Sequence, residues 1–145
     1  MAVSGRQLVG SFGAASGRLN SLTVDGQAVP LAVEGGGFFA CDATAKKSIS
    51  FSDGSVKQSE GKTVFTCEKS GDLALVAEFT HKGPYILVTG RLENRRTDER
   101  GISLNYRLPI SGPDAVFCNQ LNGSVQVGKA EIEGNVFPIA AVVAG

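Results

Sequence analysis

Ile102-Ser103-Leu104-Asn105-Tyr106-Arg107-Leu108 is the stretch that decides the fold class. Apolar side chains occupy every second position, and Ser, Asn and Arg stand between them. Successive side chains of a β-strand point to opposite faces of a sheet, so this alternation predicts a strand with one face on a core and the other toward water. We expect Leu104, at the centre of the apolar face, to be buried, and Ser103 and Arg107 to lie outside or between layers.

Two earlier runs show the same period of two. In residues 73–79 the apolar set is Leu, Leu, Ala and Phe at the odd positions, and in residues 86–92 it is Ile, Val, Gly and Leu at the even positions. The intervening positions of the second run and its continuation include Arg91 and Glu93, which we expect to lie outside or between layers. The three runs together predict strands that share one core.

Turn signals separate these runs and recur about every 8–12 residues, a spacing typical of an all-β sandwich or barrel. The clearest is Asp25-Gly26, because a two-residue hairpin turn needs positive φ at both central positions. No window of the sequence has apolar residues at helical spacing with a cap at each end. We therefore predict one all-β domain over residues 1–145, an antiparallel β-sandwich with little or no helix.

Composition excludes several classes of function. The chain has 145 residues, with 14 basic and 14 acidic side chains and a formal net charge of zero. This balance argues against a protein that binds nucleic acid by neutralising phosphates, and against a polybasic membrane anchor. No stretch approaches the roughly 20 apolar residues that span a bilayer. We expect neither nucleic acid nor membrane as a partner.

Catalytic and metal-binding patterns are missing from the sequence. His81 is the only histidine, so a Ser/His/Asp triad or a zinc site would have to be built on it. The carboxylates show no spacing that predicts a shared cleft. Cys41, Cys67 and Cys118 are too few and too widely spaced for a disulfide framework, and we expect all three to be reduced thiols. We predict no catalytic residue, no metal and no cofactor.

The densest charge cluster spans residues 92–100 and supplies the candidate ligand-binding residues: Arg95, Arg96, Asp98 and Arg100. Guanidinium groups bind carboxylates and other oxygens through paired hydrogen bonds, so these side chains could orient a polar ligand. The alternative is a solvated loop between two strands that is laced with local ion pairs.

Two stretches resemble the N-terminal β-sandwich domains of large bacterial glycosidase- or lyase-like proteins. The first is Gly17-Arg18-Leu19-Asn20-Ser21-Leu22-Thr23-Val24-Asp25-Gly26-Gln27-Ala28-Val29-Pro30-Leu31, followed by Gly36-Gly37-Phe38-Phe39 and Asp42. The second is Arg91-Leu92-Glu93-Asn94, then Asp98-Glu99-Arg100-Gly101-Ile102-Ser103-Leu104 and Leu108-Pro109-Ile110. Residues 137–142 are similar to the strand with which such domains continue.

The resemblance implies a galactose-mutarotase-like supersandwich, which in many relatives precedes an (α/α) toroid that carries the catalytic residues. Mutarotase enzymes of this fold use catalytic histidines and a glutamate. With His81 alone the chain does not present that set, so the activity is not carried over. Because Gly145 comes directly after a strand-like run, we expect the chain to be excised from, or truncated within, a larger protein.

The leading functional hypothesis is therefore a non-catalytic accessory domain of a carbohydrate-active-like protein. It would pack against a downstream catalytic-type domain of the same protein and contribute to binding of a carbohydrate. The alternative is an independent module that binds sugar or protein, as in adhesion. A third hypothesis, an enzyme in its own right, lacks a recognisable set of catalytic residues.

Overall fold

The computed structural model describes residues 7–112, 115–120, 123–126 and 141–143. These residues form β-strands joined by turns and loops, with no helix among them. The strands are β1 Leu8–Phe12, β2 Leu19–Val24, β3 Gln27–Ala28, β4 Gly37–Asp42, β5 Lys47–Ser50, β6 Ser55–Ser59, β7 Lys62–Ser70, β8 Leu73–His81, β9 Ile86–Asn94, β10 Ile102–Arg107, β11 Val116–Gln120, β12 Gly123–Gln126 and β13 Ala141–Val143.

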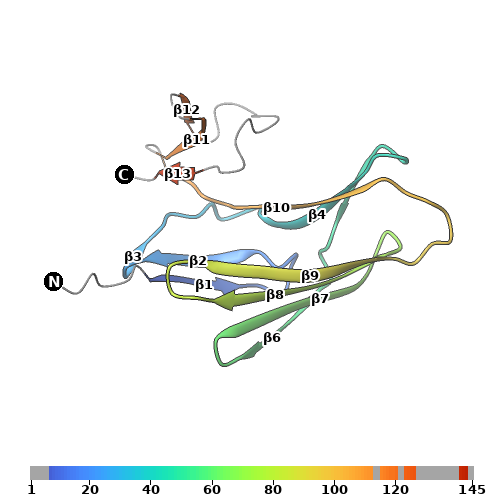
Figure 1. Ribbon diagram of the computed structural model, residues 1–145, viewed down its shortest axis with the longest axis horizontal. Coiled ribbons are helices and arrows are strands. Elements are labelled where there is room, and N and C mark those ends of the chain that lie inside the picture. Colours follow the sequence, from blue (N-terminus) through green and yellow to red (C-terminus); the bar gives the residue numbers. More distant parts are fainter. Residues whose placement is uncertain (1–6, 113–114, 121–122, 127–140, 144–145) are drawn as a thin grey trace.

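All strand pairings are antiparallel, and two sheets face each other as the layers of a sandwich. One layer is the four-stranded sheet β6-β7-β8-β9, and the other is the three-stranded sheet β10-β4-β5 (Figure 1). A third sheet, β1-β2-β3, contributes to the same core, and β12-β11-β13 form a separate small sheet. The predicted all-β antiparallel sandwich is confirmed.

The turn chemistry read from the sequence places the hairpins. Asp25 and Gly26 have φ of 52° and 82°, and they join β2 to β3 through the pair Val24↔Gln27. Positive φ at both central residues is what a tight hairpin turn requires. The turn between β7 and β8 likewise has two positive φ values, at Gly71 and Asp72.

The core lies between the two layers and is rich in aromatic rings. Phe79 of β8 stacks on Phe12 of β1 with ring centroids 3.7 Å apart, and Phe38 of β4 packs near both Phe65 of β7 and Phe79. The buried apolar cluster comprises Phe12, Leu19, Phe38, Ala40, Ile49, Phe51, Phe65, Cys67, Leu73, Leu75, Ala77 and Phe79. Its members come from both layers and from β1 and β2, so one core joins the three sheets.

The core-facing side of the strand at residues 73–79 is buried as the alternation predicts, although Ala74 and Thr80 on its other face are also largely covered. Leu73, Leu75, Ala77 and Phe79 are all at most 2% exposed. The residues expected outside, Arg91, Glu93, Ser103 and Arg107, are exposed.

The expectation that Leu104 is buried is wrong, since its side chain is 41% exposed, and Val88, on the expected core face of residues 86–92, is 49% exposed. β10 is an edge strand of its sheet, paired with β4 alone among the described strands. Ile102 and Tyr106, on the same face as Leu104, do pack against the core. Leu104 therefore lies on the core-facing side of a strand whose outer flank is not covered by any described residue.

Candidate functional site

The charged loop after β9 is organised by Asn94. Its side-chain oxygen accepts hydrogen bonds from the Arg96 backbone N–H (3.2 Å) and from Nη1 of Arg100 (3.3 Å). Its side-chain nitrogen donates to the carbonyl of Asp98 (3.2 Å). One amide thus fixes the course of the loop, and Arg100 is directed inward.

Arg100 forms a buried ion pair with Asp42 at the end of β4. Nε and Nη2 of Arg100 donate to Oδ2 of Asp42 at 3.0 and 2.6 Å, and the two side chains are 2% and 1% exposed. The other oxygen of Asp42 accepts the backbone N–H of Ala45 (2.9 Å). The pair connects the loop between the two layers to the layer that contains β4.

These hydrogen bonds determine the protonation of Asp42. The N–H of Ala45, followed by the hydrogen bond from Arg100, holds the pKa of the Asp42 carboxyl below its ordinary value of 3.8. A carboxylate that receives several hydrogen bonds is stabilised in its charged form. Asp42 is therefore ionised at neutral pH, as the buried guanidinium requires.

Arg96 and Asp98 pair with each other at the surface. Nε and Nη2 of Arg96 donate to the two carboxylate oxygens of Asp98 at 2.7 and 2.6 Å, in the bidentate arrangement. The side chains remain 46% and 48% exposed. The hydrogen bond from Arg96 lowers the pKa of Asp98, and the same contact raises that of Arg96.

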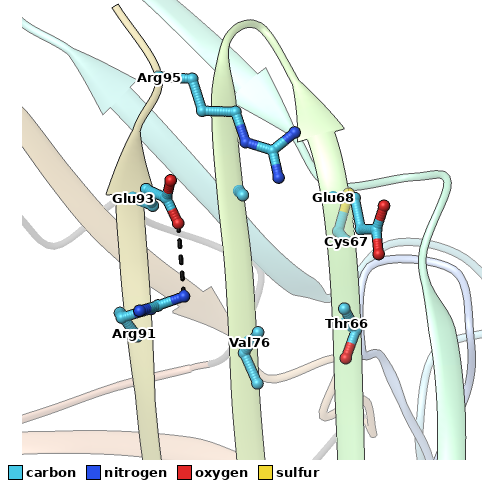
Figure 2. A pocket seen from close by; sticks show the side chains of 8 residues that line it. Thr66, Cys67, Glu68, Val76, Arg91, Glu93 and Arg95 are labelled. Carbon is cyan, nitrogen blue, oxygen red and sulfur yellow. Dashed lines mark hydrogen bonds and ion pairs between the residues drawn. The ribbon is translucent and has the colours of Figure 1, made fainter.

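Arg95 takes part in neither of these ion pairs, and its side chain extends across the outer face of the four-stranded sheet. Figure 2 shows its guanidinium reaching over β8 toward Glu68, with Arg91 and Glu93 on β9 beside it. Arg91 donates to Glu93 at 3.4 Å. The shallow depression here has a volume of about 170 Å³, and its lining includes Thr66, Glu68, Val76, Arg91, Glu93 and Arg95, which we call the polar shelf.

The structure therefore separates the four residues predicted as one ligand site. Arg100 is buried in an internal ion pair, Arg96 and Asp98 satisfy each other, and Arg95 lies on the polar shelf. The shelf offers two cations, two carboxylates and a hydroxyl, a mixture suited to hydrogen-bonding a neutral polyhydroxylated ligand. Ligand binding by these four residues stays a prediction.

A larger feature, missed at the level of sequence, is an apolar groove of about 430 Å³. Leu8 and Phe12 of β1, and Leu19 and Leu22 of β2, form one part of it. The remaining lining residues are Phe79, Tyr85, Ile86, Val88, Tyr106 and Leu108. Val88, Tyr85 and Leu108 are 49%, 53% and 53% exposed, so the groove opens to the surface.

Tyr106 connects this groove to the core. Its hydroxyl donates to the carbonyl of Gly17 (3.0 Å), and its ring meets Phe38 edge-on with centroids 4.7 Å apart. Burial raises the pKa of the Tyr106 phenol to about 12. The phenol therefore stays neutral and donates its hydrogen bond at neutral pH.

Other kinds of site were also sought in the part of the chain that the structure describes. It contains no group of three or more His, Cys, Asp or Glu side chains that could hold a metal ion. Nor does it contain a helix long and apolar enough to cross a membrane. Cys41 and Cys67 form no disulfide, whereas the side chain of Cys118 lies outside the described part.

Comparison with protein-family models, with curated proteins and with solved structures gave no match to this chain.

Proposed function

We propose that the chain is a non-catalytic accessory β-sandwich of a carbohydrate-active-like protein that docks on a neighbouring catalytic-type domain. The observation that carries the proposal is the apolar groove beside the edge strand β10. Most of its lining side chains are apolar, and the carbons of several are exposed. Exposed contiguous apolar surface of this kind marks interaction sites in soluble proteins.

The backbone of β10 indicates what kind of partner the groove takes. The N–H of Ala43 donates to the carbonyl of Gly101, the residue directly before β10. Gly101 and Ala43 are therefore a hydrogen-bonded pair, and the odd-numbered residues of β10 that follow Gly101 bond to β4 in the same way. In an antiparallel ladder alternate residues bond to opposite neighbours. The N–H and C=O groups of Ile102, Leu104 and Tyr106 are therefore directed away from β4, along the open flank.

A polypeptide in extended conformation can fill the apolar groove and also pair with the open edge of β10. Its backbone can pair with the outward groups of β10, while alternate side chains enter the groove and cover Leu104 and Leu108. The layer that contains β10 has three strands, and the facing layer has four. One added strand would make the two layers equal in width.

The polar shelf is the proposed contact surface for a carbohydrate. It lies on the outer face of β7, β8 and β9, whereas Val88 in the groove lies on their core-facing side. A domain could dock through the groove and still present the shelf to a saccharide. The resemblance to galactose-mutarotase-like domains of bacterial multidomain proteins supports the same assignment.

The test is to express the chain and the remainder of its gene product as separate polypeptides and to measure their association. We expect binding, and we expect Val88→Lys to weaken it strongly because that side chain lines the groove. Leu87→Lys is the matched control, since Leu87 is 43% exposed on the opposite face of β9. Both variants should keep the circular dichroism spectrum of the parent chain.

Two results would contradict the accessory role. One is a gene product that ends at Gly145, which would favour the alternative of an independent sugar- or protein-binding module. The other is association that Val88→Lys and Leu87→Lys weaken equally, because the groove would then not be the contact.

A further inference from the structure

A third surface hollow, of about 290 Å³, lies against the outer face of the sheet β10-β4-β5. Phe39 and Ser50 are cross-strand partners in this sheet, Ser48 pairs with Cys41, and Arg107 pairs with Gly37. We call this feature the serine hollow, and its functional lining is Ser16, Phe39, Ser48, Ser50, Ser52 and Arg107. It shares no lining residue with the apolar groove or the polar shelf.

Arg107 is the single charged group of the serine hollow. Its guanidinium carbon lies 5.1 Å from the centroid of the Phe39 ring, a cation–π contact that holds the planar group in place. No described carboxylate forms a salt bridge with it. The N–H donors of this guanidinium therefore remain available to an oxyanion, and a planar fork of donors matches a carboxylate best.

The rest of the lining is neutral and rich in hydroxyl groups. Ser48, Ser50 and Ser52 are exposed, and each hydroxyl can donate one hydrogen bond and accept two. The hydroxyl groups of a ligand both donate and accept hydrogen bonds, and serine hydroxyls can serve as partners in either role.

A glycine loop with a fixed conformation closes one side. Gly35, Gly36 and Gly37 have φ of 80°, 86° and 92°, values that side-chain-bearing residues rarely adopt. A Cβ on Gly37 would overlap Ser16, and the backbone N–H of Phe38 donates to the Ser16 carbonyl at 2.7 Å. The wall of the hollow is thus set by backbone packing and does not need a ligand to form.

We propose that the serine hollow binds a small carboxylate that also carries hydroxyl groups, of the chemical class of a uronic acid. Arg107 pairs with the carboxylate, and the hydroxyls of Ser48 and Ser50 bond to those of the ligand. The site goes beyond the proposed docking function and does not depend on it, because the groove and the hollow have no residue in common.

The experiment is a titration of the ¹⁵N-labelled chain with sodium glucuronate, followed by NMR. We expect chemical-shift changes centred on Phe39, Ser50 and Arg107, and millimolar or tighter binding. Glucose lacks the carboxylate and acetate lacks the hydroxyl groups. Each should bind at least about tenfold more weakly than glucuronate, the loss expected when a charged hydrogen-bonding pair or several hydroxyl partners are removed.

Variants test the role of the guanidinium. Arg107→Gln should lower glucuronate affinity at least about tenfold, and Arg107→Lys should lower it less, since the charge remains without the fork. Lys57→Gln on β6 is the matched control and should leave the affinity unchanged, since Lys57 is an exposed cation that lines none of the three surface features. Arg107 is exposed as well, so these variants should fold as the parent chain does.

Three outcomes would overturn the proposal: no shift at millimolar glucuronate, shifts centred on Arg95 and Glu68 instead, or inorganic phosphate binding as tightly as glucuronate. None of these outcomes bears on docking, which is tested separately by the effects of Val88→Lys and Leu87→Lys on association.

Discussion

The centre of the four-stranded sheet and the edges of the sandwich have the same alternating sequence pattern and opposite exposure. In β8, Leu75 and Phe79 are each 1% exposed. In β9 and β10, the core-facing residues Val88 and Leu104 are 49% and 41% exposed. Alternation therefore tells which side of a strand faces the core, and what packs opposite that side in the folded chain determines how far it is covered.

The comparison has a consequence for stability. An apolar side chain stabilises the fold in proportion to the area that it loses from water. Substitutions in β8 should thus be costly and those in β10 mild, although their sequences look alike. The four predictions below test this contrast, from the largest expected effect to the smallest.

Phe79→Ala should give the largest loss, about 3–5 kcal/mol of unfolding free energy, because it leaves a cavity among packed rings. Phe79 stacks on Phe12 and lies within 6.1 Å of Phe38 and Tyr106, measured between ring centroids. Urea unfolding followed by circular dichroism measures the difference. A loss near 1 kcal/mol, the average for point substitutions, would mean that the centre of the sandwich is not tightly packed.

Asp42 should give the next largest effect, and it should depend on pH. Its pKa is lower in the folded chain than its ordinary value of 3.8, so the stability it contributes is present above that value and is lost as pH falls through the folded pKa. Asp42→Asn should lower stability at neutral pH, since Arg100 is left buried without its anion. The variant should also lose less further stability on acidification than the parent chain does.

The matched control is Asp98→Asn, which removes an exposed carboxylate from its pair with Arg96. Exposed ion pairs contribute little, so this variant should lose much less stability at neutral pH than Asp42→Asn does. Equal losses in the two variants would show that burial of the Asp42–Arg100 pair has no energetic importance.

Tyr106→Phe should cost about 1 kcal/mol at neutral pH, the typical contribution of one hydrogen bond, here from the phenol to Gly17. The pKa of Tyr106 is raised to about 12 from its ordinary value of 10.0, so its contribution is complete below that value and declines as pH rises toward 12. Phenolate absorbance in a Tyr85→Phe background reports on this residue alone. Titration of the folded chain near the ordinary value would contradict the burial of the ring.

Leu104→Ala should have the smallest effect, below about 1 kcal/mol, because much of this side chain is already in water. Leu75→Ala is the matched substitution in β8 and should cost about 2–5 kcal/mol. If the two substitutions cost the same in the chain alone, β10 is covered in solution and the contrast between centre and edge fails.

Much of the fold could be predicted from local patterns. The three alternating runs, the Asp25-Gly26 hairpin and the exposure of Arg91 and Arg107 each depend on a few consecutive residues. The exposure of Leu104 could not be predicted in this way, since it depends on what covers β10 in the folded chain. Asp53-Gly54 likewise reads as a turn, but the strands on either side of it, β5 and β6, belong to different layers.

The candidate site could be predicted only in part, because side-chain partners are set by tertiary structure. Arg95, Arg96 and Arg100 look alike in sequence. Arg100 meets Asp42 across a separation of 58 residues, whereas Arg96 finds its partner two residues away. The serine hollow assembles residues from β4, β5 and β10 with a glycine loop, and no local spacing links them.

The order of strands in the two layers also bears on how the chain folds. β6, β7, β8 and β9 follow one another along the sequence, so their sheet can grow by successive hairpins with short loops to close. β10 must instead return to β4 across the whole of that meander, and closing a long loop costs more entropy and slows the step. We therefore expect the four-stranded sheet to form first and to act as the surface on which the β10-β4-β5 layer assembles, with the Asp42–Arg100 pair completed last.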